Sequence, residues 1–125
     1  MSDRLILSTL GHTWILDLDG TLVKHNGYKE DGKDSFLAGA RAFLKKIPEK
    51  DMVIFLTSRK EMYRGMTEGF LREQGIRFDH IIFDAPYGER ILINDDKPGG
   101  LKMSIGISVE RDRWDGIEVE EDRTL

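Results

Sequence analysis

The chain has 125 residues, of which 39% are hydrophobic, with a formal net charge of −4 and no cysteine. This length predicts one domain, the acidic balance argues against a broad nucleic-acid-binding or membrane-binding surface, and the absence of cysteine excludes disulfides and thiol nucleophiles. Without a secretion signal or an apolar run of roughly 20 residues, the chain is expected to be cytoplasmic.

Five segments have the patterns of strands. Residues 14–16, 52–56 and 81–83 are short, unbroken apolar runs, and residues 90–93 add a fourth run, in which Arg90 is followed by three apolar residues. Such runs are typical of strands buried on both faces of a parallel sheet. Residues 103–109 alternate between apolar and small polar side chains, which predicts a half-exposed outer strand.

Helical patterns separate the predicted strands. One helix is expected from Asp34 or Ser35, either of which can cap it, to just before Pro48. A second is expected over residues 62–75, with Gly75 as its carboxyl-terminal cap.

The order of these elements predicts the fold class. Alternating strands and helices favour an α/β protein, a three-layer α/β/α sandwich with a mainly parallel, Rossmann-like sheet. We expect a single domain over residues 1–125, with a core at about 13–109. Residues 110–125 form a charged tail in which Trp114 is the expected packing anchor.

Polar residues follow three of the predicted strands. Asp17 and Asp19 come after the first strand, Thr57 after the second, and Asp95 with Asp96 after the run at residues 90–93. The carboxyl ends of parallel strands meet at one edge of a sheet, where ligands bind. Two carboxylates about 4 Å apart repel by roughly 4 kcal/mol at an effective dielectric constant of 20. The cluster therefore predicts a cation, and Mg²⁺ suits oxygen ligands shared with a phosphate.

The string Asp17-Leu18-Asp19-Gly20-Thr21, together with Thr57 and the Asp95-Asp96 pair, resembles the haloacid dehalogenase superfamily of phosphotransferases over roughly residues 14–109. The resemblance implies that Asp17 is a nucleophile that forms an aspartyl-phosphate. Asp19 then protonates the leaving oxygen and later deprotonates the attacking water. Thr57 is expected to hydrogen-bond a phosphate oxygen.

The same resemblance implies a magnesium site and substrate contacts. Asp17, Asp95 and the backbone carbonyl of Asp19 would hold Mg²⁺, with Asp96 acting directly or through water. Three further residues are expected to contact the substrate, namely Gly20, Thr21 and Ser58. Gly20 also permits the tight turn after the first strand.

One part of the superfamily pattern is missing. Members usually carry a lysine, or sometimes an arginine, before the last acidic motif, and Ala85 stands at the expected place. Lys97 is the first candidate to replace it as a catalytic cation, and Lys60 is the second. For Lys97, simple pairing with Asp96 remains an equal alternative.

The sequence leaves the roles of two arginines open. Arg59 either contacts phosphate or forms a salt bridge. Arg90 is the first residue of the run at 90–93, and its approach to the active edge is not decided by the sequence.

The spacing of the motifs leaves no room for a cap domain. Residues 20–56 and 58–94 must each hold a crossover helix with its loops. Residues 23–33 can form a small flap, in which Lys24 and His25 are either substrate contacts or solvated loop residues. An open site of this kind admits large substrates, or a neighbouring subunit of a homo-oligomer covers it.

Together these features predict a phosphohydrolase for phosphate monoesters. Residues 94–98, followed by a Ser-Ile-Gly-Ile-Ser run, are similar to small capless members associated with surface-polysaccharide or sugar-nucleotide pathways. This similarity implies a sugar phosphate or a related small metabolite as the substrate. Two alternatives remain: a polynucleotide-end phosphatase, against which the acidic charge counts, and a binding or regulatory module without turnover, suggested by Ala85.

Overall fold

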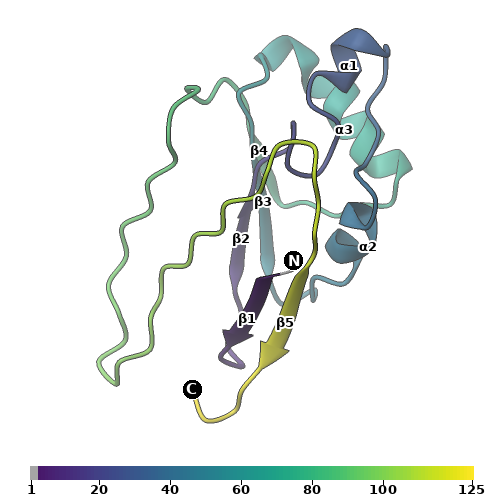
Figure 1. Ribbon diagram of the computed structural model, residues 1–125. Coiled ribbons are helices and arrows are strands. Elements are labelled where there is room, and N and C mark those ends of the chain that lie inside the picture. The colour runs from purple at the N-terminus through teal and green to yellow at the C-terminus, as the bar shows by residue number, and fades with distance from the viewer. Residues whose placement is uncertain (1–2) are drawn as a thin grey trace.

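A computed structural model describes residues 3–125 and contains two small parallel sheets. Strands β2 (Thr13–Leu16), β3 (Met52–Leu56) and β4 (His80–Ile82) form one sheet in the order β2-β3-β4 (Figure 1). The pairing is parallel throughout, with Ile15 beside Ile54. The first three predicted strands and their parallel arrangement are therefore confirmed.

The second sheet was not predicted. It pairs β1 (Asp3–Leu7) with β5 (Ile117–Glu121), in parallel and without hydrogen bonds to the first sheet. Both strands lie outside the predicted core at 13–109. Trp114, just before β5, packs against Phe43 with ring centroids 5.0 Å apart, so its role as a packing anchor is confirmed.

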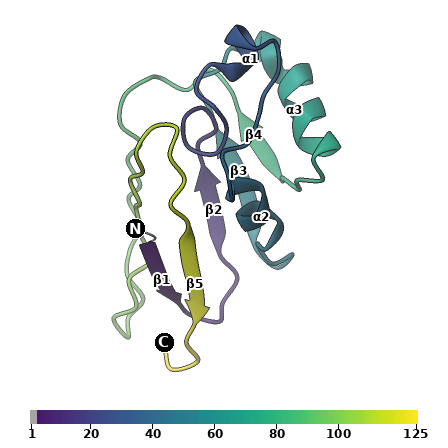
Figure 2. The ribbon, with the colours of Figure 1, turned by 45° about the vertical axis from the view of Figure 1, so that its right-hand side comes forward.

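The helices lie together on one side of the β2–β4 sheet (Figure 2). They are α1 (Gly27–Glu30), α2 (Ala40–Lys45) and α3 (Arg64–Glu73), the last preceded by the short 3₁₀ helix η1 (Glu61–Tyr63). The helical layer that a three-layer sandwich needs on the opposite side is not formed by residues 3–125.

The helix before Pro48 is shorter than predicted. Asp34 does not cap it, because the Asp34 carboxylate is buried against Arg59. Gly39 instead precedes the helix at a φ of 88°, a left-handed conformation that favours glycine. The second helix agrees with the prediction, and Gly75 follows it at a φ of 71°.

The core lies between the β2–β4 sheet and the helices. Apolar side chains from the strands meet others from α2, α3 and the turn after β2, and burying this area is the main force that holds the helices to the sheet. The buried cluster comprises Leu18, Leu22, Val23, Ala40, Leu44, Val53, Phe55, Leu71, Ile76, Ile81 and Phe83.

Residues 86–110 form a long, open excursion that we call the arm (Figure 1). The predictions of strands at 90–93 and 103–109 are wrong for this structure, because neither segment pairs with another strand. Among the described residues, 87–96 and 102–109 make no backbone–backbone hydrogen bond, and only a turn at 97–101 closes the tip of the arm. The apolar side chains of the arm therefore stay exposed.

No helix in residues 3–125 has the length and apolar character needed to cross a membrane.

Candidate active site

Asp17 lies at the carboxyl end of β2, where the chain turns sharply. The Leu18 carbonyl accepts hydrogen bonds from the amides of Thr21, Leu22 and Val23 and so closes the turn. This brings the Thr21 hydroxyl back to Asp17, where it donates to Oδ2 at 2.9 Å. The Asp17 side chain is 35% exposed, so its carboxylate is both oriented and accessible.

Gly20 is required by the geometry of this turn. Its φ is 80°, and a Cβ at this position would lie 3.0 Å from Arg111 Cγ. The Gly20 amide donates to the Val23 carbonyl at 2.8 Å. This amide already has its hydrogen-bond partner within the turn. What Gly20 contributes to the turn is therefore its left-handed backbone conformation.

Thr57 and Ser58 reach the same edge from the end of β3. The Thr57 hydroxyl is buried and accepts a hydrogen bond from the Arg59 amide at 3.1 Å. Ser58 Oγ donates to the Pro86 carbonyl and accepts from Arg90 Nη2 at 3.2 Å. Ser58 thus fixes the base of the arm beside Asp17.

The cation beside Asp17 is Arg90, whose Nη1 lies 3.7 Å from Asp17 Oδ1. Among the described residues, no ion pair joins Lys97 or Lys60 to Asp17, and Lys97 lies at the tip of the arm. Asp96 pairs with Lys102 at 2.7 Å and not with Lys97. The sequence left the approach of Arg90 to the edge undecided, because its position beside Asp17 depends on a contact between residues distant in sequence.

The Arg59 guanidinium joins Asp19, in the turn after β2, to Asp34, which follows the flap. Its Nε and Nη2 donate to the two carboxylate oxygens of Asp19, both at 2.9 Å. Its Nη1 and Nη2 also donate to Asp34, at 2.9 and 2.6 Å, and Nη1 reaches Thr67 Oγ1 at 2.9 Å. Of the two readings that the sequence allowed, the salt bridge is the one that the structure adopts.

Burial and charge act in opposite directions on this network. Burial disfavours the charged guanidinium of Arg59, yet the hydrogen bonds that it donates to Asp19 and Asp34 raise the pKa of Arg59 above its ordinary value. The Tyr28 ring lies against Arg59, with 4.1 Å between guanidinium carbon and ring centroid. Burial, and then the charge of Asp19, raise the pKa of Tyr28. Arg59 is therefore a fixed cation that ties the flap to the edge.

The flap at residues 23–33 forms, with α1 at its centre. Its Lys24 ammonium binds Asp31 at 3.0 Å, so it faces the flap's own acids. His25 packs over Gly20, its amide donates to Asp112 at 2.7 Å, and its Nδ1 is buried without a hydrogen-bond partner in residues 3–125. Of the two, His25 lies closer to the turn that carries Asp17.

Asp95 and Asp96 are not brought to this edge. Both are exposed on the arm, which runs away from the sheet (Figure 1). Both carboxylate oxygens of Asp19 accept hydrogen bonds from Arg59. Residues 3–125 contain no group of three or more acidic or histidine side chains arranged to hold a metal ion. The side chains that one chain assembles here do not fit Mg²⁺, which prefers six oxygen ligands.

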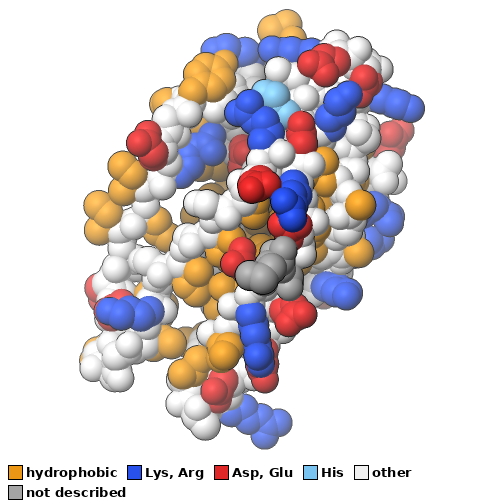
Figure 3. All heavy atoms as spheres, in the orientation of Figure 1, with side chains coloured by type: hydrophobic (Ala, Val, Ile, Leu, Met, Phe, Trp, Pro, Cys, Tyr) orange, Lys and Arg blue, Asp and Glu red, His pale blue; other side chains and the backbone are white. Residues whose placement is uncertain are grey.

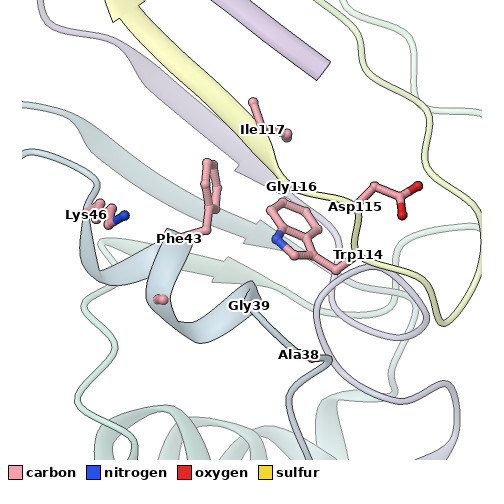
Figure 4. A pocket seen from close by; sticks show the side chains of 9 residues that line it. Ala38, Gly39, Phe43, Lys46, Trp114, Asp115, Gly116 and Ile117 are labelled. Atoms are coloured by element: carbon pink, nitrogen blue, oxygen red, sulfur yellow. The ribbon is translucent and has the colours of Figure 1, made fainter. Parts of the chain in front are cut away.

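A separate hollow of about 370 Å³ lies between α2 and the start of β5 (Figure 4). Trp114 and Phe43 line it, and its residues do not include the polar group around Asp17. It lacks the several convergent polar groups of a typical ligand site, so the edge at Asp17 remains the candidate active site.

Comparisons with known proteins give one informative likeness. No family model and no curated protein matches the chain. Among solved structures, the chain is similar to one in "Structure of Pnkp1/Rnl/Hen1 complex", with 29% sequence identity and a TM-score of 0.51. The match covers 66% of this chain and 31% of that chain, so the chain spans about a third of the length of this neighbour.

Proposed function

We propose that the chain is a phosphohydrolase that removes a terminal phosphate from a polynucleotide, with Asp17 as the nucleophile. The observation that carries this proposal is the setting of Asp17, which Thr21 orients and Arg90 flanks at 3.7 Å. A phosphate ester dianion repels a carboxylate, so a cation that offsets both negative charges favours the attack.

The chemistry divides into two steps. A carboxylate oxygen of Asp17 bonds to phosphorus while the bond from phosphorus to the ester oxygen breaks, and Asp19 gives the leaving oxygen a proton. Water then attacks the aspartyl-phosphate, Asp19 takes a proton from that water, and inorganic phosphate leaves with Asp17 restored. Both oxygens of Asp19 accept hydrogen bonds from Arg59, as in an ionised carboxylate. To donate a proton in the first step, Asp19 must therefore free one oxygen from Arg59 and carry a proton on it, and the proton taken from water in the second step restores this protonated form.

The substrate class is supported by the structural neighbour. Pnkp denotes a polynucleotide kinase/phosphatase, and 29% identity over two thirds of this chain favours a related substrate. The Asp17 side chain is 35% exposed, and no cap domain is inserted among the described elements, which suits a site that accepts the end of a long molecule. The net charge of −4 counts against tracking along a strand, but less against binding one terminal phosphate.

A sugar phosphate is the second candidate. It is favoured by the acidic net charge and by the similarity of residues 94–98 to capless members of sugar pathways. Phosphate release from a 3′-phosphorylated oligonucleotide, from its 5′-phosphorylated counterpart and from a panel of sugar phosphates decides between the two. We expect the highest kcat/KM on an oligonucleotide end. A preference for sugar phosphates would move the assignment to the second candidate, and no release from any of them would contradict the phosphohydrolase itself.

A further inference from the structure

The arm exposes an apolar run that a monomer surface rarely carries. Ile91 and Ile93 are 84% and 91% exposed, and Leu92 and Ile105 are at least half exposed. In Figure 3, hydrophobic side chains gather along the arm and around the hollow between the arm and the rest of the molecule. Such a run indicates a segment that another surface covers.

One edge of the β2–β4 sheet is also unpaired and could accept such a segment. Among the described residues, β2 pairs only with β3, so the backbone groups along its other edge have no strand partner. Ile15 on β2 is 50% exposed. Residues 87–96 of the arm also lack backbone partners. Two unpaired edges of this kind are templates for pairing with each other.

The arm cannot pair with this edge in its own chain while it keeps its observed base. Arg90 is held at Asp17, and no bend or turn interrupts residues 89–97. If Asp95 lay level with Asp17 beside β2, Arg90 would lie five residues, or about 17 Å, down the strand. The contact between Arg90 and Asp17 and the arrival of Asp95 from the same chain are therefore mutually exclusive.

We propose that the arm of one copy pairs with β2 of a second copy, and that this exchange is reciprocal, giving a closed two-fold dimer. Asp95 and Asp96 of the partner subunit then reach Asp17, while the chain's own Arg90 stays beside it. The exchange would place acidic ligands at an edge that a single chain leaves unfit for Mg²⁺. The completed site rests on the proposed function, whereas the pairing of arm and β2 does not.

The register follows from placing the partner's Asp95 level with Asp17. Ile93 of the partner subunit then lies beside Ile15, extending the row in which Ile15 already pairs with Ile54. The half-exposed Ile15 and the largely exposed Ile93 would then cover each other. This register defines the cross-link that tests the pairing.

The first experiment uses the absence of cysteine in the natural chain. The variant Ile15→Cys/Ile93→Cys is oxidised at low protein concentration, and its mass is compared with that of Ile15→Cys/Met62→Cys, a control with an exposed helical residue. Exchange predicts a covalent dimer only for the first variant, and a dimeric mass for the unmodified protein in light scattering. A monomer of 14.4 kDa, with a disulfide within one chain or with none, would overturn the proposal.

The second experiment asks whether the site is shared. Asp17→Asn and Asp95→Asn, each expected to be inactive alone, are unfolded, mixed in equal amounts and refolded together. Random pairing makes half of the dimers mixed, and one of their two sites is intact, so about a quarter of the wild-type activity should return. A mixture as inactive as its parts, beside an active wild type, would overturn the exchange. If the wild type itself is inactive, the proposed function fails and the cross-link alone decides the pairing.

Discussion

Replacing Arg59 with methionine should destabilise the protein strongly. The Arg59 guanidinium is 1% exposed and is the ion-pair partner of both Asp19 and Asp34. Removing one partner of a buried pair costs about 3–5 kcal/mol, since the remaining charge is left buried without compensation. Asp34, itself 1% exposed, cannot regain water without local unfolding. For a domain of this size such a loss lowers Tm by about 10–20 °C.

The assay is thermal and urea unfolding followed by circular dichroism. Arg72→Met is the matched control, because Arg72 is 68% exposed and pairs weakly with Glu68 at 3.5 Å; its loss should cost less than about 0.5 kcal/mol. The double variant Arg59→Met/Asp34→Asn should lose about 1–3 kcal/mol less unfolding free energy than the two single variants lose in total. If Arg59→Met unfolds within about 1 kcal/mol of the wild type, the reasoning about the buried network is refuted.

Three further predictions concern single residues. Burial tends to raise the pKa of Asp51, but hydrogen bonds from Trp14 and His12 hold it below its ordinary value. This contribution is therefore present above about pH 4 and is lost as the pH falls below it. Asp51→Asn should lower the free energy of unfolding by about 1–3 kcal/mol at pH 7, and its Tm difference from the wild type should shrink in acid melts. Gly20→Ala should cost about 1–2 kcal/mol in urea unfolding, because its φ is 80°; an unchanged midpoint would contradict a left-handed turn. Arg90→Gln should lower kcat/KM about 10²–10³-fold with Tm nearly unchanged, and equal kinetics would remove Arg90 from the site.

The sequence predicted the part of the fold that local patterns encode. The apolar runs before Asp17 and Thr57 identify β2 and β3, because an unbroken run that ends in polar residues marks a buried strand and its carboxyl end. The strands β1 and β5 were missed, since charged residues interrupt both and their pairing joins the two ends of the chain. The run at 90–93 has the pattern of a buried strand, but its partner is not supplied by the rest of the described chain.

The candidate site likewise has one part that the sequence predicted and another that it did not. Asp17 and Ser58 lie at one edge, where both contact Arg90, because each comes just after the end of a strand; Thr21 returns to Asp17 through the turn after β2. The contacts of Arg59 with Asp34 and of Arg90 with Asp17 depend on which charges meet across long stretches of chain. Spacing along the sequence carries no information on which charges meet, so the sequence did not decide the contacts of either arginine.

The most direct test of the central claim is phosphate release from a 3′-phosphorylated oligonucleotide, with Mg²⁺ present, by the wild type and by Asp17→Asn. Asn keeps the size of the side chain and removes the nucleophilic carboxylate, and equal Tm values would establish that both proteins are folded. The account predicts release by the wild type and a rate at least about a thousandfold lower for Asp17→Asn. Release that continues at the wild-type rate in Asp17→Asn would contradict it.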